Sequence, residues 1–174
     1  MQLIRGLYYM NFLDIRNCTK EDLSAVKYIY NTCMKEISCA YIPYTMETLQ
    51  DFYKIKVEKK EPFLVATYQG EVVAFTTYTL FIDWFMPIRT IDYGIYVKKS
   101  ARGKGIAKQL IRILFILAYK QGYRMANACI DFHNVASIRM HEKMGFHCIG
   151  SFNKQSKGID YIRKVLIYQK ELII

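Results

Sequence analysis

An apolar stretch that ends in a basic, glycine-containing turn constrains this chain more than any other part of its sequence. Residues 90–97 are mostly β-branched or aromatic, and Gly103 and Gly105 follow just before an apolar run of helical period. Glycines let a backbone approach an anion closely, and the free N–H groups of a first helical turn point toward it. The cations around this turn are Lys98, Lys99, Arg102, Lys104 and Lys108. The pattern predicts a strand, a phosphate-binding turn and a helix in succession.

The turn matches neither of two familiar phosphate-binding loops. It lacks the Gly-Lys-Ser/Thr ending of nucleotide triphosphatases and the three glycines of a dinucleotide-binding fingerprint. Residues 102–107, Arg-Gly-Lys-Gly-Ile-Ala, do match an Arg/Gln-x-x-Gly-x-Gly/Ala signature. In this segment the chain resembles the Gcn5-related N-acetyltransferases (GNAT), in which the loop holds the pyrophosphate of acetyl-CoA. For this segment alone, a basic helix N-terminus without a ligand is the alternative.

A second segment resembles the closing signature of the same family. Residues 134–146 read Asn-Val-Ala-Ser-Ile-Arg-Met-His-Glu-Lys-Met-Gly-Phe. Asn134 is a typical helix N-cap, and Gly145 is typical of the position just past a helix end. His141 follows Asn134 by about two helical turns, so both are expected on one face. Two signatures in the right order favour the family more strongly than either alone.

Length and composition predict one domain, residues 1–174, with residues 1–10 as an N-terminal extension. Of the 174 residues, 52% are hydrophobic, which is enough for a substantial core. No apolar run reaches the length of about 18 residues that a membrane-spanning helix needs. Residues 1–10 lack the long apolar region of a signal peptide. We therefore expect no membrane partner.

The cysteines indicate the cellular compartment, and the net charge indicates the kind of partner. The five cysteines are scattered without the paired spacing of a zinc site or a disulfide framework. We expect reduced thiols, no metal and a cytoplasmic location. The net charge of +10 suits an anionic ligand, but the basic residues form neither a long run nor a nucleic-acid-binding motif. We expect no nucleic acid partner; a nucleic-acid-binding module that relies on net charge is one alternative.

Periodicity along the chain predicts an alternating order of strands and helices. The expected strands are 12–16, 62–68, 71–80, 91–97, 124–130, 146–152 and 159–169, and the expected helices begin after Thr19, span 46–59, span 103–121 and begin at Asn134. Thr19 and Asp22 have capping-box spacing, and Gln69-Gly70 predicts a hairpin turn. Loops are expected at 33–44 and 81–89.

This order is similar to the GNAT fold from end to end. The resemblance implies the α/β (α+β) class, with a mixed, mostly antiparallel sheet of about seven strands flanked by about four helices. It also implies a splay between the fourth and fifth strands.

Within the family, the chain most resembles the phosphinothricin and methionine sulfoximine N-acetyltransferases, over roughly residues 12–169. The match rests on Ile15-Arg16, residues 19–23, 29–31, 95–97 and 137–146. It implies acetyl-CoA as donor, CoA as product, a small amino-acid-like amine as acceptor, and a homodimer. The methionine sulfoximine enzymes carry Gly-x-Trp-x-Asp before the last strand, where this chain has Asp160, Ile162 and Lys164. That departure concerns the acceptor and leaves the donor unaffected.

Direct acetyl transfer to an amine needs a base, stabilisation of the oxyanion and a proton for the departing thiolate. Asp92 falls where the resembling enzymes carry a Glu, so we expect it to be the base. Its side chain is one methylene shorter, so it would act through a water or on a closer substrate; a solvated strand aspartate is the alternative. His141 stands where many members have a Tyr that protonates the thiolate, and a plain polar helix residue is its alternative. The cofactor-binding residues that the resemblance implies are Ile95, Tyr96 and Val97 through their backbone, Arg102, Gly103, Lys104, Gly105, Ile106, Ala107 and Asn134.

Acceptor selection is expected in residues 33–44, 81–89 and 153–161. The aromatic candidates there are Tyr41, Tyr44, Trp84 and Tyr161, although an aromatic residue is more often core than site. None of the cysteines lies beside a convincing base, so a covalent enzyme intermediate is disfavoured. Two further functions stay open: a protein or peptide N-acetyltransferase, and a CoA-binding sensor without catalysis.

Overall fold

A seven-stranded sheet organises the protein, and the computed structural model describes residues 13–36, 42–81, 89–154 and 162–173. The strand order is β1-β2-β3-β4-β5-β7-β6, antiparallel throughout except for the β4–β5 pair, which is parallel. The strands are β1 (Leu13–Asn17), β2 (Phe63–Tyr68), β3 (Glu71–Phe81), β4 (Thr90–Val97), β5 (Met125–Asp131), β6 (His147–Lys154) and β7 (Arg163–Glu171). The helices are α2 (Leu23–Glu36), α3 (Met46–Glu58), α4 (Ile106–Lys120) and α5 (Val135–Lys143), with short 3₁₀ turns η1 (Lys20–Asp22) and η2 (Lys99–Ala101). The expected fold class and element order are confirmed.

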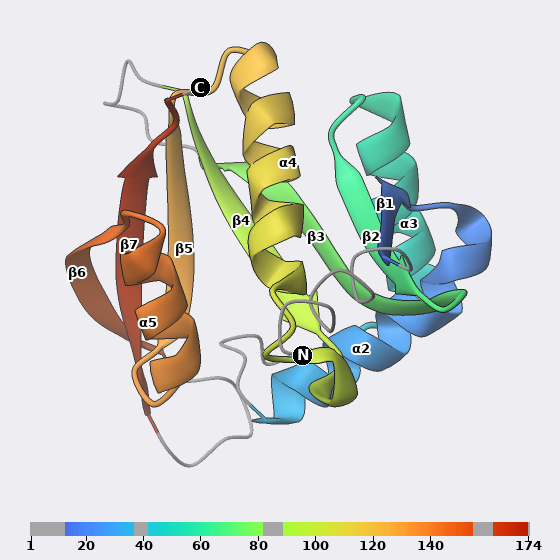
Figure 1. Ribbon diagram of the computed structural model, residues 1–174, viewed down its shortest axis with the longest axis horizontal. Helices are drawn as coiled ribbons and strands as arrows, with labels where there is room; N and C mark the ends of the chain where they lie inside the picture. Colours follow the sequence, from blue (N-terminus) through green and yellow to red (C-terminus); the bar gives the residue numbers. More distant parts are fainter. Residues whose placement is uncertain (1–12, 37–41, 82–88, 155–161, 174) are drawn as a thin grey trace, which may run out of the picture.

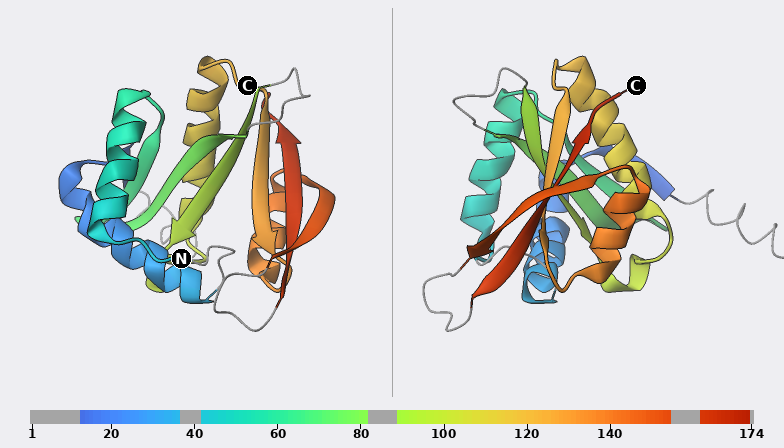
Figure 2. Two further views of the ribbon diagram at one scale, coloured as in Figure 1. Left: turned by 180° about the vertical axis from the view of Figure 1, so that it is seen from behind. Right: turned by 90° about the vertical axis from the view of Figure 1, so that its left-hand side faces the viewer.

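Helices cover both faces of the sheet (Figures 1 and 2). The α4–α5 face carries one apolar cluster, which includes Ile91, Tyr93, Leu114 and Phe146. The α2–α3 face carries a second cluster around Val26, Leu49, Val65 and Phe75. Because successive residues of a strand point to opposite faces, neighbours along β4 serve different clusters. Each face of the sheet therefore presents its own set of side chains to the site described below.

Local signals in the sequence set several of the element boundaries. Asp22 accepts a hydrogen bond from the backbone N–H of Thr19 at 2.8 Å and pairs with Arg16 at 2.6 Å, so the expected capping box is confirmed. The hairpin turn at Gln69 and Gly70 is also confirmed, with φ values of 53° and 80°. Two positive φ values in succession are typical of the tight turns that join antiparallel strands.

Two of the boundaries that differ from the expectation lie next to the site. The loop predicted from residue 33 starts later, because α2 continues to Glu36 and buries Cys33 on the same stripe as Ile29 and Tyr30. The helix predicted from Gly103 starts at Ile106, since Gly103 and Gly105 have φ values of 76° and 78°. Left-handed residues cannot continue a right-handed helix. The turn therefore keeps three more residues of open loop than the sequence pattern indicated.

Strands β4 and β5 diverge, as expected from the resemblance (Figure 1). All of β4, Thr90–Val97, pairs with β3, whereas its pairing with β5 covers Thr90 to Asp92. The ladder between β4 and β5 therefore stops at Asp92, and the two strands separate beyond that residue.

Candidate active site

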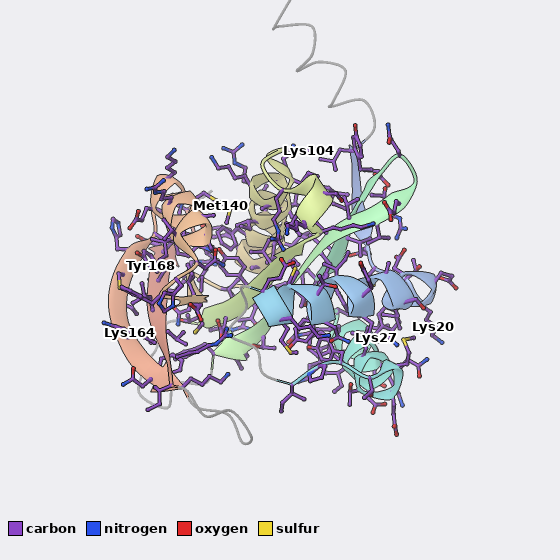
Figure 3. All side chains as sticks on the ribbon, turned by 90° about the horizontal axis from the view of Figure 1, so that it is seen from below. Lys20, Lys27, Lys104, Met140, Lys164 and Tyr168 are labelled. Carbon is purple, nitrogen blue, oxygen red and sulfur yellow. The ribbon has the colours of Figure 1, made fainter. Side chains whose placement is uncertain are left out.

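A cavity of about 720 Å³ lies where β4 and β5 separate. Its lining comes from strands β2 to β6, the turn after β4, and helices α2 to α5. Figure 3 looks onto this end of the molecule and shows Lys104 of the turn and Met140 of α5 on the α4–α5 face, opposite Lys27 of α2. The cavity therefore reaches both faces of the sheet through the splay.

The turn before α4 presents backbone donors to this cavity. Gly105 is the N-cap of α4, and the first backbone bond of the helix runs from the N–H of Gln109 to the carbonyl of Gly105. The N–H groups of Ile106, Ala107 and Lys108 precede that bond, so the helix itself does not use them. A helix N-terminus also carries partial positive charge. Of the expected residues 103–107, all but Lys104 line the cavity; the Lys104 ammonium lies 5.1 Å from the centroid of the Tyr68 ring.

Arg102 is turned toward α2. Its Nε donates to the carbonyl of Val97 at 3.1 Å, and its Nη1 donates to Glu36 at 3.0 Å. Its Nη2 lies 3.6 Å from the sulfur of Cys33. The side chain therefore ties the end of β4 and the turn to α2.

Asp92 occupies the closed end of the splay, opposite Asn127 in the last residue pair of β4 and β5. It is partly buried and lines the cavity. Burial raises the pKa of its carboxyl group from 3.8 to about 6. A carboxylate with a pKa near the working pH is well matched to proton abstraction. Alternation along β4 places this side chain on the α2–α3 face.

His141 lies at the cavity wall on the other face, and it is 2% exposed. Its Nδ1 lies 2.8 Å from the carbonyl oxygen of Ser137, and a carbonyl only accepts, so Nδ1 carries the proton of the neutral ring. Burial lowers the pKa of the imidazole. Donation of a proton from Nε2, the role implied by the resemblance, requires the cationic ring that burial disfavours. Asn134 caps α5 and accepts from the N–H of Ser137 at 3.2 Å.

Three of the expected acceptor residues, Tyr41, Trp84 and Tyr161, lie outside the described residues. The fourth, Tyr44, lines the cavity, together with Tyr30 and Tyr96. The Tyr30 ring lies 4.1 Å from that of Tyr44 and 5.1 Å from that of Tyr96, measured between centroids. Sequence reasoning placed Tyr30 on the apolar face of a helix, and only the meeting of α2 with β4 turns that face into a cavity wall.

The opposite wall contains residues that sequence reasoning did not single out. Cys129, Asp131 and Lys154 line the cavity from β5 and β6. Asp131 is 6% exposed, accepts from the N–H of His133 at 2.9 Å and lies 3.4 Å from Arg163. The sequence around these residues does not indicate that they line a cavity, because that depends on where β5 separates from β4.

Within the described ranges, no group of three or more His, Cys, Asp or Glu side chains is arranged to hold a metal ion. The four described cysteines, Cys18, Cys33, Cys129 and Cys148, are free thiols. None of the described helices combines the length and apolar character that crossing a membrane requires.

Comparison with known proteins matches residues 26–146 to the model of the Acetyltransferase (GNAT) family. A relative named L-methionine sulfoximine/L-methionine sulfone acetyltransferase, from Pseudomonas aeruginosa PAO1, is 31% identical over 142 residues, which cover 78% of this chain and 81% of the relative. The crystal structure of an N-acetyltransferase from Staphylococcus aureus Mu50 has a TM-score of 0.82 and 34% identity, covering 92% of this chain and 99% of that one.

A third likeness is limited to the fold. The phosphinothricin acetyltransferase of Sinorhizobium meliloti, solved in complex with acetyl-CoA, has a TM-score of 0.80 and 21% identity, covering 92% of this chain and 89% of that one. The family match spans both sequence signatures and the whole splay. The chain therefore belongs to the GNAT family and is an N-acetyltransferase.

Proposed function

We propose that this enzyme transfers the acetyl group of acetyl-CoA directly to the primary amine of a small amino-acid-like molecule. The observation that carries the proposal is one cavity that is lined both by the amide donors of Ile106, Ala107 and Lys108 and by Asp92. The relative that acts on methionine sulfoximine and the fold neighbour that binds acetyl-CoA support the two substrates.

Acetyl-CoA supplies an activated thioester, and the residues of this chain bind and orient it. The N–H groups of the turn bind the pyrophosphate, with Lys104 and Lys108 close by in the sequence. The backbone of Ile95, Tyr96 and Val97, beyond the last residue of β4 that pairs with β5, holds the pantetheine arm along β4. Asn134, at the start of α5, closes this side of the site.

The acceptor amine enters from the α2–α3 face, where Asp92 receives its proton directly or through a water. The free amine then attacks the thioester carbon, and the C–S bond breaks with its electron pair on sulfur. Tyr30, Tyr44 and Tyr96 form the described wall beside that amine. Tyr41, Trp84 and Tyr161 stay in the proposal as acceptor-binding residues.

Thiol release from acetyl-CoA tests this function. The purified protein is mixed with methionine sulfoximine, phosphinothricin, free amino acids and peptides, and each reaction is followed by mass spectrometry of the acetylated product. We expect release with one of the small amines. Release with peptides alone would favour a protein N-acetyltransferase, and CoA binding without release for any amine would favour a sensor.

The proposal includes a homodimer in the cytoplasm. Strand β6 is the last strand of the described sheet, and it exposes Ile149 by 56% and Phe152 by 41%. Edge strands offer unpaired backbone groups to a second chain. The free thiols of the described cysteines suit a reducing compartment. Sedimentation of the wild type and of Ile149→Lys distinguishes dimer from monomer, with the variant expected to be monomeric.

A further inference from the structure

Two buried side-chain polar atoms in the described part of the chain have no hydrogen-bond partner: the hydroxyl of Tyr93 and Nε2 of His141. Tyr93 is 6% exposed and His141 2% exposed. An unpaired polar atom in the interior carries a desolvation penalty, so such atoms are uncommon and call for an explanation. Both residues line the cavity, which makes a bound ligand the natural partner.

The two side chains are neighbours within an aromatic wall. Their ring centroids lie 5.9 Å apart. The centroid of the Phe146 ring lies 6.0 Å from that of Tyr93 and 5.1 Å from that of His141. The Phe115 ring lies 5.1 Å from that of Tyr93, also between centroids. The low polarity of this wall strengthens any hydrogen bond that a ligand makes to the two atoms.

The two atoms have opposite hydrogen-bonding character. Nδ1 of His141 donates to Ser137, so Nε2 of the neutral ring is an acceptor. Burial raises the pKa of the Tyr93 hydroxyl well above 10, so it remains a donor. The titratable groups beside Tyr93 are Asp92 on its own strand and His141 on α5. The wall thus offers one donor and one acceptor side by side.

The position of the pair matches the sulfur end of the donor. Tyr93 directly follows Asp92, the last residue of β4 that pairs with β5. Adjacent strand residues face opposite sides, so Asp92 serves the amine and Tyr93 faces α4 and α5. An acetyl carbon placed within reach of Asp92 would therefore leave the sulfur of the thioester on the Tyr93 side.

We propose that Tyr93 and His141 form a donor–acceptor pair for the thiol end of CoA. The Tyr93 hydroxyl donates to the sulfur, most strongly to the thiolate left when the C–S bond breaks, and keeps its proton. His141 Nε2 accepts from the nearest amide N–H of the pantetheine arm. The amine proton goes to Asp92, so the step needs no further reactant. This inference rests on the proposed use of acetyl-CoA.

Calorimetry with CoA and with desulfo-CoA, which lacks the sulfur, tests the pair without an acceptor amine. In the wild type, the affinity for CoA should rise relative to desulfo-CoA as the pH passes about 8.5, the thiol's ordinary pKa. Tyr93→Phe should remove that rise and lower the affinity for CoA about 10-fold at high pH, with desulfo-CoA unaffected. His141→Asn should weaken both ligands equally, since both contain the amide.

Tyr168→Phe is the matched control, because Tyr168 is 4% exposed on β7 and its hydroxyl donates to Glu142 at 3.0 Å (Figure 3). It should lower the unfolding temperature and leave both affinities unchanged. Tyr93→Phe, which removes an unpaired hydroxyl, should leave the unfolding temperature of the free protein unchanged or raised.

Two results would overturn the pair: an unchanged ratio of CoA to desulfo-CoA affinity in Tyr93→Phe, or a loss of unfolding temperature as large as that of Tyr168→Phe. A wild type that binds no CoA would overturn the proposed function together with this inference.

Discussion

Asp92 and Asn127 face each other in the last residue pair that joins β4 to β5. Neighbouring side chains support this pair: that of Thr79 donates to the backbone carbonyl of Asp92 at 3.4 Å, and that of Gln169 donates to the side-chain oxygen of Asn127 at 2.9 Å. The carboxylate of Asp92 therefore extends from a fixed backbone into the cavity. Preorganisation of this kind is what a catalytic base requires.

Replacement of Asp92 by Asn should lower kcat by about 10²–10⁴-fold, because the amine loses its proton acceptor. The wild-type rate should fall as the pH drops below about 6, since burial raises the pKa of Asp92 to about 6 and the base must be ionised. Asp92→Glu should retain part of the activity. Thiol-release assays across pH measure both effects, and acetyl-CoA affinity by calorimetry should be unchanged in Asp92→Asn. Full activity in Asp92→Asn would exclude this residue as the base.

The same carboxylate should cost stability. Its pKa is about 6 in the folded protein, against an ordinary value of 3.8. Ionisation therefore destabilises the folded protein in full above pH 6. Below about pH 3.5 the carboxyl group is protonated in the folded and the unfolded protein, so the effect is absent. Asp92→Asn should therefore raise the free energy of unfolding by about 1–3 kcal/mol at pH 8 and leave it unchanged at low pH. Urea unfolding at the two pH values measures this. Asp51→Asn, at an exposed position of α3, is the control.

Substitution of Gly105 by Ala should weaken acetyl-CoA binding. Its φ of 78° strains any residue with a Cβ by about 1–2 kcal/mol, and relief of that strain moves the first N–H groups of α4. Gly70→Ala is a matched control, because Gly70 has a φ of 80°, an equally open surrounding and a position in a hairpin away from the cavity. Both variants should lose similar stability in thermal unfolding. Equal acetyl-CoA affinities would show that the conformation of the turn does not matter for binding.

Loss of a buried ion pair at the end of α3 should change the stability more than loss of an exposed pair on the same helix. Lys56 is 3% exposed, lies 2.6 Å from Glu61 and has its pKa lowered by burial. Glu61→Gln removes the counter-charge of this buried lysine and should cost about 3 kcal/mol, whereas the double replacement of Lys56 by Met and Glu61 by Leu removes both charges and should cost less. Lys54 and Glu58 are 4.0 Å apart and exposed, so Glu58→Gln should change stability by less than about 0.5 kcal/mol. Chemical denaturation of the three variants gives the comparison.

Local sequence signals predicted most of the fold. The capping box of Asp22, the turn at Gly70 and the cap at Asn134 each depend on residues within about one turn of chain, and each was predicted. The early end predicted for α2 was wrong because Cys33 packs against distant strands, which no nearby residue indicates. The start of α4 was wrong because glycines are compatible with a helix as well as with a positive φ.

The sequence predicted only those parts of the candidate site that belong to a sequence signature. Asp92 and the turn were placed by motif, and both line the cavity. The orientation of Arg102 depends on Glu36, 66 residues away, and the tautomer of His141 depends on a carbonyl whose direction only the folded helix defines. Tyr93 was missed because strand alternation places it in the core. Whether a buried hydroxyl has a hydrogen-bond partner cannot be predicted from the sequence.

Within the described sheet, β4 and β5 are joined by three residue pairs. The half of the sheet from β1 to β4 and the half from β5 to β6 therefore share few main-chain hydrogen bonds. A substrate that fills the gap, as we propose for acetyl-CoA, would take the place of a strand and couple the two halves of the sheet. Amide hydrogen exchange along β5 and β7 should therefore slow when acetyl-CoA is added, even at residues the ligand never touches. The enzyme would then be a looser molecule between turnovers than during them.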